Sequence, residues 1–500
     1  MLGSLQLFIF LLKTSFTKSI NINNGSLNRE LIYSKIINYL AGAHLLVEGH
    51  PYLPNASSVF KEMLMEVGVE STDEFFRDLP NQSFELCGIP TKPLDEPSVI
   101  NEVKRILSKN KVYAKSFTGG GPWYHYVPSI IKYLISRGEF LTSYTPYQPE
   151  ISQGVLQALF EFQSMICELY KMDVANASLY DLPTAIGEAA LLSARVTGRR
   201  KFVIPAYLPN DRKNVILNYT YPMDIRLVEV PLSKDDGCPD LEYLKTVVDS
   251  ETSGIYIETP TFFGTINANI KAFVEVAHDA GALAIVGADP LSLGLFRPPG
   301  EYDADIAVGD GQPLGIPPGA GGNTLGLMVC RDDPRIIRQL PGRIVGLTRS
   351  KDEGRRGYVL ALSTREQHIR REKATSNICT NEALLAISAA IYIATMGRKG
   401  IARVAKKIMY NTQYVLDRLR EFGISPLFKC LHFRDFAINV GDIERVNRAL
   451  IQNEIMGGRD LEKEFGMAGV SLFAVTELHT KEDIDLFAKI LATEGRTKGV

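Results

Sequence analysis

Residues 254–289 read "GIYIETPTFFGTINANIKAFVEVAHDAGALAIVGAD". A short β-branched run opens this stretch, a helical pattern covers 271–281, and a second apolar run follows at 282–289. Similar apolar runs occur at "KFVIP" (201–205), "IRLVEVP" (225–231), "DIAVGD" (305–310) and "LGLMVC" (325–330). Nearly continuous apolar strands joined by helices are typical of a buried, mostly parallel sheet. This part of the chain is therefore predicted to be α/β.

Helices are predicted on both sides of these strands. Residues 155–172 form one long helical pattern, and residues 183–198 form another, with Pro183 suited to its first turn and Gly198 to its end. Further helices are expected at 383–397 and 400–423. A smaller α+β lobe then closes the chain, and its last helix starts with Thr480 and Asp483 at near capping-box spacing.

The chain is too long for a single hydrophobic core, because 500 residues exceed what one core usually supports. Four parts are predicted: a poorly ordered or artefactual extension (1–49), an N-terminal helical arm (50–120), a large α/β domain (121–400) and a small C-terminal α+β domain (401–500). The apolar run "LQLFIFLL" at 5–12 is far shorter than the ~20 residues that span a bilayer.

Composition limits the possible partners and the compartment. The chain has 55 basic and 57 acidic residues, a balance that argues against a nucleic-acid or membrane-surface protein. Its six cysteines lie far apart, without a CxxC pair or the spacing of a zinc site. We therefore expect a cytoplasmic protein with reduced thiols, no metal site, and small molecules or other proteins as partners.

Asp289 directly follows a predicted strand, where the loops of parallel sheets build ligand sites. A turn or cap carboxylate at Asp-Pro is the simpler interpretation. A carboxylate here would also hold the pyridine nitrogen of pyridoxal phosphate, but that cofactor needs a Schiff-base lysine as well. After Asp289 no lysine occurs before Lys351, and the expected loop carries Gln312. A dinucleotide site at Gly309, Gly311 and Gly315 is disfavoured because Pro313, Pro317 and Pro318 prevent the required helix.

Three other segments contain candidate functional residues. The segment "FTGGGPWYHYVP" (117–128) holds His125 between two tyrosines, as either a packing residue or a catalyst. The segment "REQHIRREKATSN" (365–377) is either a solvated helix face or an anion clamp or subunit contact. The segment "SYTPYQPEISQG" (143–154) is rich in rigid, hydrogen-bonding side chains but has no nucleophile: its candidate residues are Tyr144, Thr145, Tyr147, Gln148 and Glu150.

Long strings of this sequence resemble one known family. They are "SYTPYQPEISQGVLQALFEFQ", "MDVANASLYD", "DPLSLGLFRPPGEYDADIAVGDGQPLGIP", "LPGRIVG", "EGRRGYVL" and "REQHIRREKATSNICTN". In this order they resemble the glycine cleavage system P-protein, glycine dehydrogenase (decarboxylating), over residues 50–490. The chain is about half as long as the fused enzyme requires, and it is similar to the N-terminal half, which is subunit 1 of the split form.

The resemblance implies a pyridoxal-phosphate enzyme of aminotransferase-like fold type I, with a large seven-stranded, mostly parallel sheet and a small C-terminal lobe. It implies that only subunit 2 carries the Schiff-base lysine and that Gln312 stands at the equivalent position here. The implied reaction is glycine decarboxylation, with transfer of the aminomethyl group to the lipoyl H-protein, by an α2β2 heterotetramer. Pyridoxal phosphate would be bound mainly by subunit 2, with none in this subunit alone.

If the lysine is on the partner, the tyrosines of 143–154 can reach across the interface and line its pocket, together with His125. A structural turn before the helix at 155–172 is the alternative. Two departures from the family pattern, "YDLPTAIGEA" (180–189) and "PPGAGGNTLG" (317–326), indicate that this chain's own cofactor site, with Asp289 and Gln312, is degenerate. A non-catalytic scaffold or regulatory homologue, and an independent enzyme using Asp289 and His125, remain the competing hypotheses.

Overall fold

The computed structural model describes residues 57–78, 94–121, 123–319, 321–322, 324–351 and 354–495. The chain consists of two compact units, residues 1–109 and 110–500. The first unit contains α3 (Ser57–Val67), the 3-10 helix η1 (Thr72–Phe76) and α4 (Glu96–Leu107). The predicted extension, 1–49, lies outside the described residues.

A seven-stranded sheet forms the centre of the second unit, in the order β2-β8-β7-β6-β5-β3-β4. Its strands are β2 (Val174–Ala175), β3 (Lys201–Pro205), β4 (Arg226–Val230), β5 (Thr252–Glu258), β6 (Leu283–Gly287), β7 (Ile306–Asp310) and β8 (Gly326–Cys330). Strands β4, β3, β5, β6 and β7 pair in parallel, whereas β8 is antiparallel to both of its neighbours. The mostly parallel sheet is confirmed, and its edge contains the two-residue strand β2, which has too few residues to be recognised in the sequence.

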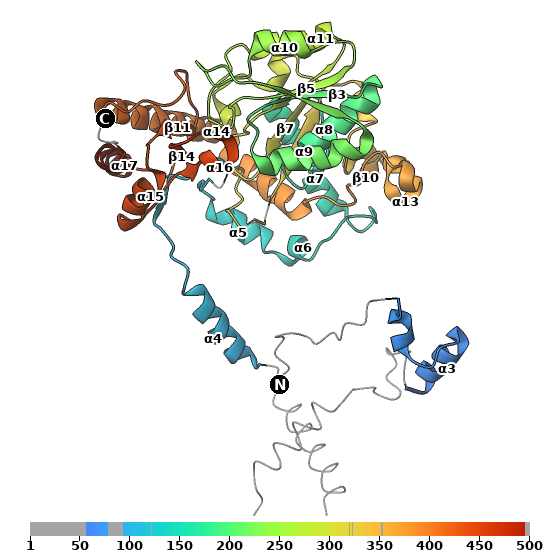
Figure 1. The fold of residues 1–500 in the computed structure, drawn as a ribbon. Helices are drawn as coiled ribbons and strands as arrows, with labels where there is room; N and C mark the ends of the chain where they lie inside the picture. Colours follow the sequence, from blue (N-terminus) through green and yellow to red (C-terminus); the bar gives the residue numbers. More distant parts are fainter. Residues whose placement is uncertain are drawn as a thin grey trace, which may run out of the picture. The chain divides into compact units, whose positions relative to one another are not determined.

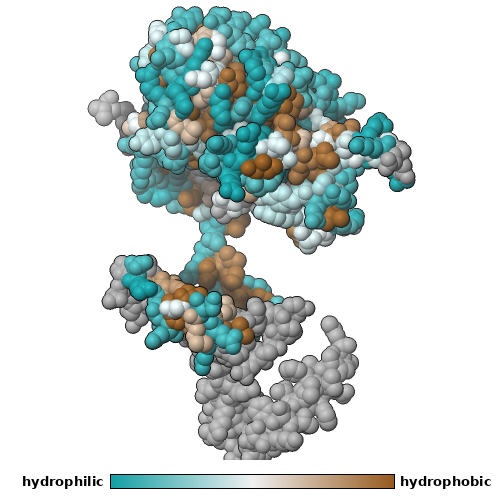
Figure 2. Space-filling view, turned by 90° about the vertical axis from the view of Figure 1, so that its right-hand side faces the viewer, coloured by the Kyte–Doolittle hydropathy of each residue, from teal (hydrophilic) through white to brown (hydrophobic). Residues whose placement is uncertain are grey.

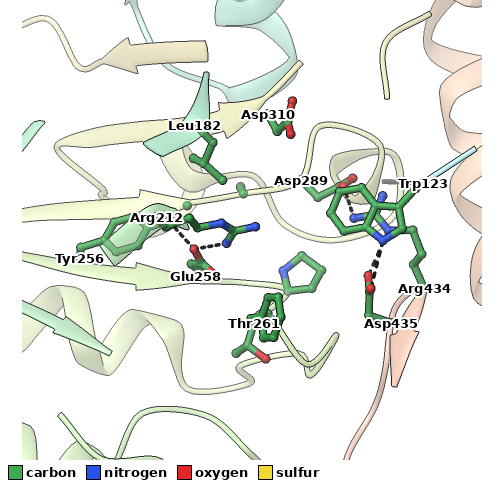
Figure 3. A pocket seen from close by; sticks show the side chains of 14 residues that line it. Trp123, Leu182, Arg212, Tyr256, Glu258, Thr261, Asp289, Asp310, Arg434 and Asp435 are labelled. Carbon is green, nitrogen blue, oxygen red and sulfur yellow. Dashed lines mark hydrogen bonds and ion pairs between the residues drawn. The ribbon is translucent and has the colours of Figure 1, made fainter. Parts of the chain in front are cut away.

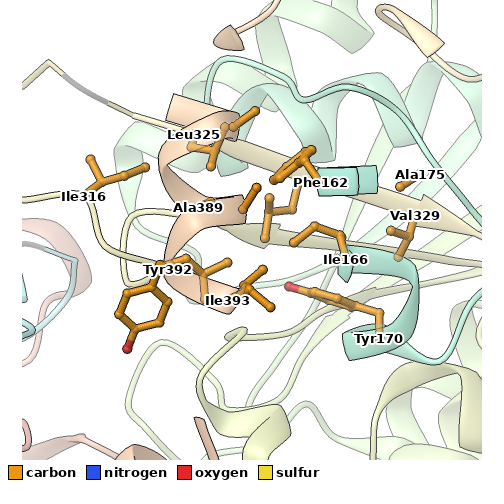
Figure 4. Packing of buried hydrophobic residues seen from close by; sticks show 14 of the residues in the cluster. Phe162, Ile166, Tyr170, Ala175, Ile316, Leu325, Val329, Ala389, Tyr392 and Ile393 are labelled. Carbon is orange, nitrogen blue, oxygen red and sulfur yellow. The ribbon is translucent and has the colours of Figure 1, made fainter. Parts of the chain in front are cut away.

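Helices cover both faces of the sheet (Figure 1). Alternate residues of β7 point to opposite faces. Ile306 and Val308 pack in the core that α8 (Leu182–Thr197) covers, and Ala307 packs in the core on the other face. That second face is covered partly by α7 (Gln153–Tyr170) and α14 (Ala383–Glu421), whose side chains interdigitate in Figure 4. Farther along the same face, α10 (Leu241–Val247) and α11 (Ile270–Asp279) pack over β5 and β6. Burial on both faces explains the nearly continuous apolar strands.

The helix ends follow the local sequence. Helix α8 begins with Pro183 in its first turn and ends at Gly198, whose φ of 73° is the left-handed conformation that glycine adopts without strain. The two helices predicted at 383–397 and 400–423 form the single element α14, which is kinked at Gly397 with φ 59° and ψ 177°.

Helix α14 links the sheet core to the C-terminal lobe, because it contributes Ile387 to the first and Leu416 to the second. In this lobe a three-stranded antiparallel sheet has the order β11-β14-β13, from β11 (Asp435–Asn439), β14 (Val470–Ala474) and β13 (Arg459–Asp460). Helices α15 (Ile443–Gln452) and α17 (Lys481–Glu494) pack on it. Thr480 and Asp483 form the predicted capping box of α17.

The remaining elements are mostly short. They are β1 (Lys115–Ser116), α5 (Ser129–Ile135), α6 (Gly138–Leu141), α9 (Asn210–Thr220), η2 (Tyr221–Met223), η3 (Ser292–Gly294), η4 (Pro299–Tyr302), α12 (Pro334–Ile337), β9 (Ile344–Arg349), β10 (Arg356–Ala361), η5 (Ser363–Arg365), α13 (Gln367–Arg370), η6 (Arg371–Lys373), β12 (Ile455–Met456) and α16 (Glu462–Phe465).

Candidate functional site

A small pocket lies at the carboxyl ends of the central parallel strands (Figure 3). Glu258 ends β5, Asp289 follows β6, and Asp310 ends β7, so the topology brings three carboxylates to one edge of the sheet. All three line the pocket. Its cavity is about 50 Å³, which has room for a few water molecules, since each needs about 10–15 Å³. Ligands of parallel sheets bind at this edge.

Both oxygens of the Asp289 carboxylate have partners. One accepts hydrogen bonds from the backbone N–H groups of Leu291 (2.9 Å) and Ser292 (3.0 Å), as a turn carboxylate does. The other lies 2.6 Å from the guanidinium of Arg434. Asp289 therefore both holds its own loop and neutralises a buried cation.

Arg434 reaches this pocket from the residue before β11 in the C-terminal lobe. Its guanidinium also contacts Asp435 (3.2 Å), and its central carbon lies 3.3 Å from the centre of the Trp123 ring. The Trp123 indole N–H in turn donates to Asp435 (3.0 Å). Burial by itself lowers the pKa of Arg434, but Asp289 and Asp435 outweigh it and raise the pKa. Arg434 is therefore a permanent cation.

His125 is a buried member of this cluster, at 7% exposure. Its Nδ1 lies 2.9 Å from Glu477, and its Nε2 lies 3.3 Å from Arg434. A guanidinium can only donate hydrogen bonds, so Nε2 accepts and the proton is on Nδ1, which donates to Glu477. In this geometry both ring nitrogens of His125 have a partner within the chain. His125 touches Arg434 but is not among the residues that line the cavity.

Gln312 follows β7 in a loop that does not continue as a helix. Its side-chain N–H group donates to the Ile316 carbonyl (2.5 Å), and its side-chain oxygen is buried with no partner within the described parts of the chain. The side chain is thus turned along its own loop, and Gln312 does not line the pocket. Burial raises the pKa of the neighbouring Asp310.

The N-terminus of α8 also meets the pocket, through Leu182. Helix N-termini bind anions by their unpaired backbone N–H groups. Here the Asp181 carboxylate accepts the N–H of Thr184 at 2.8 Å, and Pro183 has no N–H to offer. Asp181 therefore caps α8 and occupies one of the N–H groups that an anion could bind.

A second buried ion pair completes the pocket wall. The guanidinium of Arg212, on α9, lies 2.6 Å from Glu258, which also accepts the Tyr256 hydroxyl at 2.6 Å. Glu258 could have been predicted by the rule that selected Asp289, because it too ends a parallel strand. No local signal marks Arg212, since its role depends on a contact that only the fold creates.

The segment 143–154 lies elsewhere, in the loop after α6 and the first turn of α7. Tyr144 is 72% exposed and Tyr147 48% exposed. The Tyr147 hydroxyl accepts from Arg343 at 2.9 Å, and the Arg343 guanidinium lies 4.7 Å from the ring centre. Arg343 is itself fixed by an ion pair with Glu366. Tyr147 is therefore held in place by Arg343, whereas Tyr144 is open to solvent.

None of the five candidates from this loop lines the Asp289 pocket. Gln148 and Glu150 are exposed, and Thr145 is half-buried. Hydrophobic residues reach the molecular surface in several patches (Figure 2). From the segment before α5 to the start of α7, the exposed large side chains are Tyr124, Tyr126, Ile130, Tyr133, Leu141, Tyr144, Tyr147 and Ile151. Such a concentration of exposed apolar side chains is typical of an interaction surface.

The basic segment 365–377 is not one solvated helix. It is divided into η5, α13 and η6, and the backbone turns at Arg371, with φ 53°. Arg365 points inward and donates to the Gly342 carbonyl at 2.9 Å. Within this segment, Glu366 holds Arg343 and thereby supports Tyr147.

Comparison with known proteins identifies the family. The family model of the glycine cleavage system P-protein matches residues 50–491. This chain belongs to the glycine cleavage system P-protein family. The resemblance inferred from the sequence is thereby confirmed, including its limits along the chain.

The P-protein relatives match this chain over nearly their full length. It is 48% identical over 462 residues to the probable glycine dehydrogenase (decarboxylating) subunit 1 of Staphylothermus marinus, covering 89% of this chain and 98% of the relative. The probable subunit 1 of Thermococcus kodakarensis is 46% identical, covering 87% and 96%. The chain thus resembles the subunit of a split enzyme.

Solved structures support the same fold. A glycine decarboxylase (P-protein) of the glycine cleavage system, crystallised in inhibitor-bound form, matches with a TM-score of 0.75 and 40% identity, covering 89% of this chain and 100% of that one. A sphingosine-1-phosphate lyase from Burkholderia pseudomallei matches with a TM-score of 0.59 and 15% identity, covering 81% and 92%, and shows the fold alone. The predicted aminotransferase-like fold type I is confirmed.

The pocket of this P-protein chain does not fit pyridoxal phosphate. Asp289, which would hold the pyridine nitrogen, is paired with Arg434. At the start of α8, Asp181 already accepts the Thr184 N–H and Pro183 has none, so fewer backbone N–H groups are left to bind the phosphate. No lysine is among the described residues that line the cavity. The residues present therefore satisfy one another rather than a cofactor.

The described residues contain no group of His, Cys, Asp and Glu side chains arranged to hold a metal ion. Within the same residues, α14 is the one helix long and apolar enough to cross a membrane. Packing accounts for its composition, because Ala386, Ile387 and Tyr392 lie in the sheet core and Leu416 and Leu419 in the core of the C-terminal lobe.

Proposed function

We propose that this chain works as subunit 1 of glycine dehydrogenase (decarboxylating). Together with subunit 2 it decarboxylates glycine and passes the aminomethyl group to the lipoyl H-protein. The support is the family match over residues 50–491 and the subunit 1 relatives that it matches at 46–48% identity. The free cysteines among the described residues are consistent with a cytoplasmic protein.

The partner subunit holds pyridoxal phosphate, and this chain supplies none of the covalent chemistry. The observation that carries this division is the 2.6 Å ion pair of Asp289 with Arg434, which uses the carboxylate that a cofactor would need. When bound in the partner, pyridoxal phosphate supplies an electron sink for decarboxylation. The two kinds of subunit assemble as an α2β2 heterotetramer.

The contribution of this chain is a wall of the shared pocket. Tyr144 and Tyr147, with Thr145, Gln148 and Glu150, form the part of the surface that faces the partner. Tyrosine suits this task because it is stiff and its phenol can hydrogen-bond a carboxylate. Glycine has no side chain to hold, so a close-fitting wall that excludes water and larger amino acids provides the selectivity.

Reconstitution with subunit 2 tests the proposal. We expect the mixed complex to exchange the glycine carboxyl group with labelled bicarbonate in the presence of lipoyl H-protein, and each subunit alone to show no exchange. Loss of assembly, or full exchange by subunit 2 alone, would refute it.

The double variant Tyr144→Phe/Tyr147→Phe tests the wall. We expect assembly to persist, because Arg343 keeps its contacts with Glu366 and Cys379, and exchange to fall by about 10-fold or more, as for loss of a hydrogen bond to a charged group. Tyr221→Phe, at a tyrosine that is 78% exposed on η2, is the matched control. Unchanged exchange in the double variant would instead favour a pure scaffold.

A further inference from the structure

The C-terminal lobe places the guanidinium of Arg434 in the pocket at the strand ends, where several side chains contact it. Arg434 is 3% exposed and touches Asp289, Asp435, His125 and the face of Trp123. Figure 3 shows Arg434 beside the indole ring and paired with Asp289. A carboxylate at one edge and an aromatic ring on one face form a site for a planar, delocalised cation.

We propose that Arg434 is a built-in ligand of a planar-cation site, and that it occupies the place which a protonated pyridine ring takes in a cofactor-binding chain of this fold. This inference rests on the proposed function in one respect only, namely that the group replaced by Arg434 is the pyridine ring of pyridoxal phosphate. A guanidinium has the two properties of a pyridinium that matter here: a delocalised positive charge and flat faces that stack. Asp289 can therefore keep its charge and position without a cofactor.

The position of Arg434 gives this ligand a structural task. It is in the C-terminal lobe, Asp289 belongs to the loop after β6, and Trp123 belongs to the segment that precedes α5. Trp123 is tied to the lobe a second time by its bond to Asp435, and Gly120 donates to the same carboxylate at 2.8 Å. One cation thus joins three parts of the second unit. This chain can hold its lobe against the sheet without any bound small molecule.

A planar-cation site differs from an ordinary ion pair in the cations that can replace the arginine. An ordinary ion pair needs only positive charge, so any small cation would replace the arginine. A planar-cation site requires the flat face as well, because the indole ring covers one side of the guanidinium at 3.3 Å. The shape of the cation therefore distinguishes the two possibilities.

Trp123 is the single tryptophan of the chain, so intrinsic fluorescence reports on this site directly. The experiment uses the full-length Arg434→Ala variant, titrated with methylguanidinium at millimolar concentration. Loss of the guanidinium should let water reach the indole and shift its emission to longer wavelength. Methylguanidinium should reverse more than half of the shift with a saturating curve. Methylammonium and sodium at the same ionic strength should reverse almost none of it.

Two further variants make the result specific. Arg331→Ala removes another arginine that pairs with a buried carboxylate, Asp305 at 2.6 Å, and should leave the emission unchanged. Arg434→Lys keeps the charge but loses the flat face, so its emission should stay shifted and methylguanidinium should have no effect on it. This variant also serves if Arg434→Ala does not fold.

The proposal is overturned if Arg434→Lys emits like the wild type, or if methylammonium restores the emission of Arg434→Ala as well as methylguanidinium does. A linear, non-saturating response that the wild type shares would also overturn it. Because no assay here uses glycine, the H-protein or subunit 2, its failure leaves the proposed function standing, and failed reconstitution leaves this result unaffected.

Discussion

At the scale of single residues, Glu188 on α8 is a buried carboxylate. Among the described residues, no cation lies at contact distance from it. One of its oxygens accepts from the Ser376 hydroxyl at 2.6 Å, and the other is buried without a hydrogen bond in the described structure. Burial raises the pKa of Glu188 from 4.5 to about 7, and Arg195 and Arg365 only partly oppose this. The folded state therefore favours the protonated acid.

The sign of the resulting pH dependence follows from proton linkage. Between pH 4.5 and 7 the folded state binds more protons at Glu188 than the unfolded state does, so this contribution to stability is complete below pH 4.5 and is lost as the pH rises through 7. Glu188→Gln imitates the neutral acid at every pH. Relative to the wild type, the variant should gain up to roughly 3 kcal/mol between pH 5 and pH 8.5.

Thermal unfolding of both proteins at these two pH values measures that gain. Glu444→Gln, at a side chain that is 87% exposed on α15, is the control and should show no pH-dependent difference. An equal difference in melting temperature between Glu188→Gln and the wild type at both pH values would contradict the assignment.

From the sequence, single site residues could be predicted only at positions that the fold class itself indicates, such as the ends of parallel strands. Asp289 was predicted at the sheet edge because it follows a strand, and Gln312 was noted because a lysine was expected. The contact that decides the role of Asp289 comes from Arg434, in another lobe, and nothing near Arg434 in the sequence indicates it. Long-range pairing of charges depends on how the lobes pack, which local patterns do not encode.

At the scale of secondary-structure elements, α17 illustrates a signal that the sequence carries completely. The Thr480 hydroxyl accepts the N–H of Asp483 at 3.2 Å, and the Asp483 carboxylate accepts the N–H of Thr480 at 3.0 Å. Thr480→Ala should lower the free energy of unfolding by about 1 kcal/mol, because it leaves one of these N–H groups unpaired. A lower urea midpoint would measure this loss.

Thr493→Ala, near the other end of the same helix, is the matched control for this change. Its exposed hydroxyl bonds only the Lys489 carbonyl, one turn back, so the variant should stay within about 0.5 kcal/mol of the wild type. Equal losses in the two variants would show that the capping box does not stabilise α17 in the way described.

Elements with a strong period were predictable, and those without one were not. The apolar runs at 201–205 and 305–310 are strands with the same bounds or one residue fewer, because burial on both faces demands continuous apolar residues. The run at 365–377 has helical composition but is broken at Arg371, since Arg365 and Glu366 turn inward to partners from another part of the chain. Tertiary contacts override a weak local preference.

At the scale of the whole molecule, two separate places carry the proposed function. One is the pocket at the strand ends, which this chain fills with its own Arg434 and Arg212. The other is the exposed loop with Tyr144 and Tyr147, which does not line that pocket. Arginines of the chain itself occupy the pocket, and the tyrosine loop is exposed. This combination is what one half of a shared active site would need.

Covalent trapping of the cofactor tests this division of labour most directly. The reconstituted complex is reduced with borohydride in the presence of pyridoxal phosphate, and both chains are mapped by peptide mass spectrometry. We predict a phosphopyridoxyl group on one lysine of subunit 2 and on no lysine of this chain. Stoichiometric labelling of a lysine in this chain would contradict the account.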